Sequence, residues 1–423
     1  MRKSAVKEIP QGYKNSPLGI IPNEWEVKRL GEISQMFSGG TPKSTEQMYF
    51  NGEIPFIKSG EINNAKTEQY LSELGLKNSS AKLIERGDLL YALYGATSGE
   101  CALSKISGAI NQAILCIRPT KDVDRYFLLS FLQKGKEYYY NSYLQGGQGN
   151  LSADIVKGYK ILTPPLPEQR KIAEVLSTWD RAIEKQMLLI EKLELRKKGL
   201  MQQLLTGKKR LHGFNGVAWK KVKLDEVTTF LSNNSLSRDN LNTLRGSILN
   251  IHYGDVLIKL PTIVNVSLVD LPFINEELNI VSKDFVSEGD IIMADTAEDG
   301  TVGKACEVVN VGNNKVVSGL HTILIHPTIA FAPMFLGYYL NSKEYHKQIL
   351  SIMQGIKVYS ITKDALRKTN IKIPPLEEQN AIAEILSVCD NEITLAKQKL
   401  DTLRQQKKGL MQVLLTGKKR VEL

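Results

Sequence analysis

The feature that most constrains this chain is a stretch of 47 residues that occurs twice. Residues 164–210 and 374–420 align without a gap, and 26 of the 47 positions are identical. Both copies contain the letters EQ near their start and end with KKGLMQ, one variable residue and LLTGKKR. An internal match of this length indicates a duplication, so we expect one half of the chain to repeat the fold of the other.

Each copy is predicted to form one long helix. Pro167, Glu377 and Glu378 are typical of a helix N-terminus, and Gly207 and Gly417 are typical of the residue after a helix. Apolar residues recur at alternating steps of four and three, which is the heptad pattern of a coiled coil. A helix of about 40 residues is ~60 Å long, and we expect the two copies to bury their seams against each other. The seam residues are Ile172, Leu176, Trp179, Ile183, Ile190 and Leu193, and in the second copy Ile382, Leu386, Ile393, Leu400 and Leu403.

Both copies interrupt the seam at the same place. Lys197 and Lys407 occupy seam positions, and Gly199 and Gly409 follow two residues later. One interpretation is that the seam ends there and the last turns splay apart. The other is a separate apolar patch, because a glycine inside a helix costs about 1 kcal/mol and suggests close approach of a neighbouring backbone. In that case a partner subunit docks on Leu200, Met201, Leu204, Leu410, Met411 and Leu414.

Two longer blocks, residues 25–163 and 219–373, are related more weakly. Each opens with a Trp, Trp25 or Trp219, has a Gly-Asp followed by aliphatic residues, and ends with a helix that starts near Phe127 or Phe335. Short β-prone runs are spaced irregularly in both blocks, which argues against a doubly wound sheet. These runs are GEIPFIKSG, GDLLYALYG, NQAILCIRP, GDVLIKL, GDIIMAD and HTILIHP.

The predicted fold class is therefore α+β. Two mixed α/β blocks are separated by two long antiparallel coiled-coil helices, with pseudo-twofold symmetry. The predicted boundaries are 1–24 for an N-terminal segment packing near the helices, 25–163 for the first block, 164–211 for the central helix, 212–373 for the second block and 374–423 for the C-terminal helix.

The loops of both blocks carry clusters of side chains that read base edges and hold phosphates in DNA complexes. Such clusters are also ordinary turns, but their recurrence in both blocks favours DNA contact. The candidates in the first block are Gly40, Thr41, Lys43, Ser44, Lys58, Ser59, Thr97, Ser98, Asn111, Gln112, Gln148 and Asn150. Those in the second are Ser237, Arg238, Asn240, Asn250, His252, Tyr253, Ser318, His321, Gln354 and Lys357.

Motifs for catalysis and metal binding are missing from the sequence. It contains no complete P-loop, no GxGxxG, HExxH or GxSxG, and its five histidines and four cysteines have no ligand spacing. Asp255 and Lys259 could form half of a nuclease motif, but this pairing is more often structural. The net charge of +10 fits a polyanionic partner, although both long blocks are nearly neutral. With no secretory signal and no membrane span, we expect a cytoplasmic protein.

Several motifs together resemble the specificity (S) subunit of a type I restriction–modification enzyme. They are GYKNSPLGIIPNEW, FSGGTPKS, IPFIKSGEI, GATSGECAL, NQAILCIRP, NIHYGDVLIK, SGLHTILIHP and the doubled PPLxEQ…LLTG helix. The resemblance implies two target-recognition domains, each reading one half of a split, asymmetric site in double-stranded DNA, and helices that act as a spacer.

The same resemblance implies that methyltransferase (M) and restriction (R) subunits dock on the chain. Those partners would supply S-adenosylmethionine, ATP and Mg²⁺, while this chain would bind no cofactor and catalyse no reaction. The YGATSGE turn departs from a more apolar turn in relatives, which affects the target sequence and not the class. The alternative is a protein–protein scaffold with two interaction domains on a coiled-coil strut.

Overall fold

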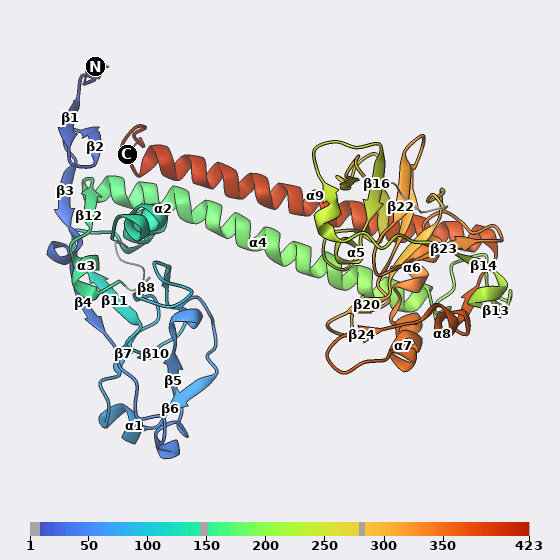
Figure 1. Cartoon of the computed structure of the whole chain (residues 1–423). Coiled ribbons are helices and arrows are strands. Elements are labelled where there is room, and N and C mark those ends of the chain that lie inside the picture. Colours follow the sequence, from blue (N-terminus) through green and yellow to red (C-terminus); the bar gives the residue numbers. More distant parts are fainter. Residues whose placement is uncertain (1–8, 144–150, 279–283, 423) are drawn as a thin grey trace. The chain divides into compact units, whose positions relative to one another are not determined.

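Two helices of 39 residues each dominate the fold, as the repeat predicts. In the computed structural model, which describes residues 9–143, 151–278 and 284–422, they are α4 (Leu166–Leu204) and α9 (Leu376–Leu414) (Figure 1). The chain divides into two compact units. Unit 1 combines the chain up to Met187 with the stretch from Gln398 onward, and unit 2 is Leu188–Lys397, so both helices contribute to both units.

Unit 1 contains the first block, built on two four-stranded sheets. One sheet has the antiparallel order β4 (Ser34–Ser38), β11 (Ile114–Pro119), β8 (Leu89–Ala92) and β9 (Cys101–Leu103). The other has the order β6 (Gln69–Leu71), β5 (Ile54–Ile57), β10 (Gly108–Ile110) and β7 (Lys82–Ile84), with β5 and β10 parallel. The remaining elements are the hairpin β1 (Tyr13–Ser16) and β2 (Gly19–Pro22), the pair β3 (Glu26–Arg29) and β12 (Lys160–Thr163), and the helices α1 (Glu73–Lys77), α2 (Arg125–Tyr143) and α3 (Ala153–Lys157).

Unit 2 contains the second block, which repeats this plan with a fifth strand in its larger sheet and an additional two-stranded pair. Its larger sheet has the order β14 (Thr228–Leu231), β23 (Thr322–Pro327), β19 (Ile291–Ala294), β21 (Ala305–Val309) and β17 (Ile263–Asn265). Its other sheet has the order β15 (Leu241–Asn242), β18 (Phe273–Ile274), β16 (Ile248–Ile251) and β22 (Lys315–Ser318). The remaining elements are the pairs β13 (Lys220–Lys223) with β25 (Asn370–Ile373) and β20 (Thr296–Ala297) with β24 (Tyr359–Ser360), and the helices α5 (Tyr253–Ile258), α6 (Phe335–Leu340), α7 (Lys343–Ile352) and α8 (Lys363–Arg367).

The weak relation between the blocks is thus confirmed by their strand pairing. The four strands β4-β11-β8-β9 correspond to β14-β23-β19-β21, and the parallel pair β5–β10 corresponds to β16–β22. The mixed α+β class is confirmed, as are the strands after Gly87-Asp88 and Gly289-Asp290.

One predicted strand is wrong: most of the run GDVLIKL forms the helix α5. His252 caps this helix, because its Nδ1 accepts a hydrogen bond from the Gly254 N–H at 3.2 Å. Val256 on this helix is buried, and it packs into an apolar cluster that includes Ile251 and Val264. Here the cap and the tertiary packing override the β-propensity of the aliphatic run.

Lys197 and Lys407, which interrupt the apolar seam, form ion pairs, and the helices around them are not frayed. Within unit 1, the Lys407 Nζ lies 2.6 Å from an Asp180 carboxylate oxygen, and within unit 2, the Lys197 Nζ lies 2.5 Å from one of Asp390. The two helices run antiparallel in each unit and stay in contact there, so the prediction that they splay apart at these positions is wrong. An acidic residue on the facing helix satisfies each lysine.

The predicted subunit-docking patch is also corrected. Leu204, Met411 and Leu414 are buried, and Leu200, Met201 and Leu410 pack around them as partly buried neighbours. Met411 and Leu414 join a core with the first block, whereas Leu204 joins a core with the second. These six side chains therefore anchor the chain's own blocks on the helices, because an apolar patch next to an apolar block is buried intramolecularly.

Candidate nucleic-acid interface

The polar loops of the first block leave the two sheets at one common edge. Strands β4 and β8 end where the antiparallel β11 begins, and the parallel strands β5 and β10 end together. Backbone hydrogen bonds hold these loops side by side, from Gly40 N–H to the Ile110 carbonyl and from Asn111 N–H to the Ile57 carbonyl. The topology therefore gathers segments that are distant in the sequence.

A cavity of about 470 Å³ opens between these loops. Its lining combines hydroxyl, amide and ammonium groups with two phenylalanines, one of which, Phe56, is fully buried. The lining residues are Thr41, Ser44, Gln47, Phe50, Asn51, Phe56, Lys58, Gln69 and Asn111. Such a mixture can hydrogen-bond the edge of a base and pack against its face.

Two contacts fix the shape of this edge. A Cβ on Gly39 would lie 1.8 Å from the Ile110 carbonyl oxygen, so only glycine allows the loop after β4 to approach β10 this closely. The Glu61 carboxylate accepts hydrogen bonds from the Lys58 N–H at 3.0 Å and the Thr67 hydroxyl at 3.0 Å. It therefore holds the turn that presents Lys58.

Most of the first block's predicted residues lie on these loops. Thr41, Lys43, Ser44 and Gln112 are exposed there, Lys58, Ser59 and Asn111 are half-buried, and Thr41 donates a hydrogen bond to Gln112. Ser98 is corrected to a structural role, because it is buried and its hydroxyl donates to the Leu93 carbonyl at 3.0 Å. Gln148 and Asn150 lie outside the described residues.

The second block has an equivalent edge. Its loops are tied together by hydrogen bonds from Gly319 N–H to the Ile251 carbonyl and from Asp295 N–H to the His321 carbonyl. The Gly319 bond is the counterpart of the bond from Asn111 to Ile57 in the first block. The strands β20 and β24 add the loop with Gln354 and Lys357, which are both exposed, to this edge.

Three residues predicted to contact DNA form the support of this edge instead. Asn250, Ser318 and His252 are buried, and His252 caps α5. The Asn234 side-chain amide donates to the Asn250 Oδ1 at 2.7 Å and to the Ser318 carbonyl at 3.0 Å. Burial keeps these side chains away from a partner, which corrects the prediction for them.

The exposed chemistry of the second edge differs from that of the first. Arg238 is exposed and donates to the buried Asp255 carboxylate at 2.8 Å, and the Lys259 Nζ lies 3.7 Å from the same carboxylate, so Asp255 has the structural role that the sequence favoured. The Tyr253 ring lies 5.3 Å from the His321 ring. Burial, with the Arg238 charge beside it, lowers the pKa of His252 and so favours the neutral imidazole, whose Nδ1 can accept the capping hydrogen bond.

Sequence reasoning missed several lining residues. Gln47, Asn51 and Gln69 line the cavity of the first block, but they come from separate short elements and share no motif. Asn234 holds the second edge together, and its only sequence signal is a position in a run of polar residues. Only the topology shows that these residues meet.

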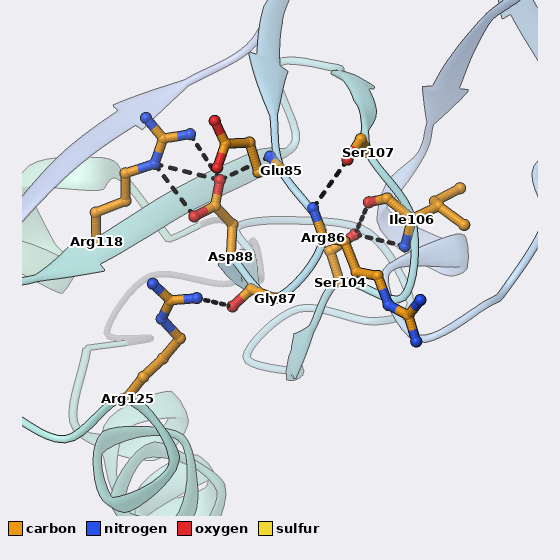
Figure 2. Close-up of polar contacts among 9 residues, drawn as sticks. All are labelled: Glu85, Arg86, Gly87, Asp88, Ser104, Ile106, Ser107, Arg118 and Arg125. Atoms are coloured by element: carbon orange, nitrogen blue, oxygen red, sulfur yellow. Dashed lines mark hydrogen bonds and ion pairs between the residues drawn. The ribbon is translucent and has the colours of Figure 1, made fainter.

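In the first block, the sheet β4-β11-β8-β9 carries an ion pair with a structural role at the strand ends opposite the polar loops. The Arg118 guanidinium binds the nearly buried Asp88 carboxylate, with its Nη2 at 2.7 Å from Oδ2, and Arg125 donates to the Gly87 carbonyl at 2.7 Å (Figure 2). Burial opposes ionisation of Asp88, but Arg118 and the Glu85 N–H outweigh it and lower the pKa of Asp88. In the second block His326 replaces this arginine, 2.6 Å from Asp290, and there burial raises the pKa of Asp290.

Replacing Arg118 by methionine is expected to destabilise the first block by about 1.5–3 kcal/mol, because a buried carboxylate loses charged hydrogen bonds. Hydrogen exchange at the amides of β8 and β11 measures this loss. The ion pair stabilises the block while Asp88 is ionised, and this stabilisation disappears as the pH falls through the lowered pKa of Asp88. The stabilities of the wild type and of Arg118→Met should therefore become equal in acid. Lys136→Met, which breaks an exposed pair with Glu100, is the control and should cost less than about 1 kcal/mol. Equal effects of both substitutions would contradict this account.

Among residues 9–143, 151–278 and 284–422, no group of three or more His, Cys, Asp or Glu side chains could hold a metal ion. None of the helices that the structure describes combines the length and apolar character needed to span a bilayer.

Comparison with known proteins identifies the family. The sequence model of the type I restriction modification DNA specificity domain matches residues 22–195 and 216–405. The chain belongs to this family. As a type I specificity chain it serves DNA target recognition, and catalysis in these systems lies in other subunits.

Relatives cover nearly the whole specificity chain. The MjaVIII specificity subunit of Methanocaldococcus jannaschii is 26% identical over 95% of this chain and 94% of its own length. The putative MjaX specificity subunit of the same organism is 27% identical over 97% of both chains. The type I S subunit structure from M. genitalium has a TM-score of 0.56 at 13% identity and covers 94% of this chain and 96% of its own. A chain from a study of type I system assembly and conformational transition has a TM-score of 0.58 at 18% identity, over 94% of this chain and 99% of its own.

Proposed function

We propose that this specificity chain reads a two-part, asymmetric site in double-stranded DNA, with one recognition block for each half. The observation that carries the proposal is that both blocks build the same loop edge from different side chains. The first edge presents Thr41, Lys58 and Asn111, whereas the second presents Arg238 and Tyr253. Equivalent frames with different hydrogen-bonding groups read different base sequences.

The charge distribution supports a contribution of partner subunits to DNA affinity. Because both blocks are nearly neutral, phosphate attraction by this chain alone is modest, and clamping by partners supplies much of the affinity. The partners would be methyltransferase and restriction subunits, which would bring S-adenosylmethionine, ATP and Mg²⁺ to a complex assembled in the cytoplasm. A solved relative comes from work on the assembly of a type I system.

Exposed apolar side chains on the helices suit such partners. In unit 2, Leu195 on α4 and Leu395 on α9 are 68% and 64% exposed, and Leu188 and Val388 lie one heptad earlier on the same helix faces. These residues are outside the buried seam, so a partner can cover them without opening the helix pair.

The proposal is tested by producing the chain with the modification subunit of its system in cells that lack other DNA methylation. Mapping of methylated bases should return one motif with two unlike halves and a fixed gap. A gel shift of the purified complex against random-sequence competitor should show a band specific to that motif. A methylated motif without two halves would contradict the two-part site, and binding that ignores sequence would contradict DNA reading and favour the scaffold.

A further inference from the structure

Each recognition block is attached to the helices by a buried carboxylate in a first helical turn. In unit 1, Glu168 at the start of α4 accepts a hydrogen bond from the Trp25 indole at 3.0 Å. The Arg420 guanidinium binds both oxygens of the same carboxylate, and its Nη1 also reaches Glu24 at 2.8 Å. Only 2% of the Glu168 side chain is exposed.

Unit 2 repeats the bonds to the buried carboxylate with the same atoms, whereas the third guanidinium nitrogen, Arg210 Nη1, donates to the Val217 carbonyl at 2.7 Å in place of a second carboxylate. Glu378 at the start of α9 accepts from the Trp219 indole at 3.0 Å and from two nitrogens of Arg210, each at 2.7 Å. In both units the arginine comes from the segment after the other long helix. Arg420 follows α9 and holds the first block, which is followed by α4. Arg210 follows α4 and holds the second block, which is followed by α9.

A second polar contact recurs twelve residues further along each helix. The Tyr126 hydroxyl of the first block donates to Asp180, which also pairs with Lys407. The Tyr338 hydroxyl of the second block donates to Asp390 at 2.7 Å, and Asp390 pairs with Lys197. The lysines that interrupt both seams therefore complete the attachment of the blocks.

Two polar contacts on one helix determine the orientation of a recognition block on that helix better than apolar packing does. Twelve residues correspond to ~18 Å of helix, so the pair of contacts resists both pivoting and sliding of the block. Bidentate Arg–carboxylate bonds are directional, whereas the apolar contacts around them are not. The apolar core holds each block on the helices, and the polar contacts set its angle.

We propose that Arg420 and Lys407 are positioning residues for the first recognition block, and that Arg210 and Lys197 are positioning residues for the second. Each block is thus aimed by residues at the C-terminal end of the helix that does not directly follow it. The inference rests on the proposed function, because the block angle matters when two half-sites must be met at a fixed gap.

The test compares Arg420→Met and Arg210→Met in the full chain. Hydrogen exchange of the free chain should become at least tenfold faster in β3 and β12 for Arg420→Met, with β13 and β25 unchanged, and Arg210→Met should give the reverse. Arg404→Met removes an exposed i,i+3 ion pair on α9 and serves as the control, with no change in either pair of strands. Arg420→Lys should recover only part of the protection, because lysine lacks the bidentate geometry.

The functional arm maps methylated sites for the same variants produced with the modification subunit. Both half-site sequences should stay as in the wild type, while methylation of sites with a gap one base pair longer or shorter rises about tenfold. Wild-type gap tolerance in both variants, or exchange that rises equally in both blocks, would overturn the positioning roles. A wild-type chain that yields no two-part motif would overturn the proposed function instead.

Discussion

A chimaera in which residues 25–163 are replaced by the equivalent block of another family member is expected to methylate sites with one new half and one unchanged half. The block is well suited to exchange, because it begins and ends on the paired strands β3 and β12. Glu26 lies opposite Thr163 in that pair, so both cut points are neighbours. The gap should stay the same, since the helices are untouched.

The exchange requires that the donor block keep the residues that meet the helices. These are the equivalents of Trp25, Tyr126 and the loop at Asp124, whose N–H donates to the Gln169 side chain at 2.9 Å. Methylation mapping reads the result, and a matched control exchanges 25–163 for a block of the same specificity. A chimaera that alters both half-sites would show that the two blocks do not read independently.

The sequence predicts the parts of the fold that depend on periodicity. The heptad pattern predicts α4 and α9 because a buried seam repeats over five heptads, and the repeat predicts that both blocks share a plan. It could not predict what Lys197 and Lys407 contact, because their partners Asp390 and Asp180 are about 190 and 230 residues away. The letters EQ in both copies were the available sign that the helix starts have a specific role.

The N-termini of α2 and α6 are capped by different residues in the two blocks. Asp124 caps α2 by accepting from the Tyr126 and Phe127 N–H groups. At the same place before α6 stands Met334, which has no capping side chain and adopts a positive φ of 71°. Glu307 from β21 supplies the carboxylate instead, accepting from Met334 and Gly337, and burial raises the pKa of Glu307 to about 7. A single sequence cannot reveal such a replacement, because the new partner lies on another strand.

The site residues were predictable by type but not by exposure. Loops rich in Ser, Asn and Lys indicated the edge of each sheet, yet Ser98, Asn250, His252 and Ser318 turned out to be its internal support. Asn, Ser and His serve equally well as turn residues and as DNA contacts, since the same groups bond backbone and bases. Burial separates the two roles, and it follows from the tertiary fold.

Substituting alanine for Gly39 is expected to abolish methylation, because the new Cβ would lie 1.8 Å from the Ile110 carbonyl oxygen. A backbone atom cannot yield as a flexible side chain does, so the loop after β4 must leave β10 and the cavity lined by Thr41 and Asn111 must change shape. The cost to stability should be about 3 kcal/mol or more, measured as hydrogen exchange in β4, β5 and β10.

Gly60 on the neighbouring loop provides a matched control. A Cβ there would meet no atom within 4 Å, so Gly60→Ala should change stability by less than about 0.5 kcal/mol. Gly60→Ala should also leave the sequence of the second half-site unchanged. Because the second block folds on its own core, Gly39→Ala should keep wild-type exchange in β16 and β22. Retention of full methylation by Gly39→Ala would mean that this edge is not the surface that reads the first half-site.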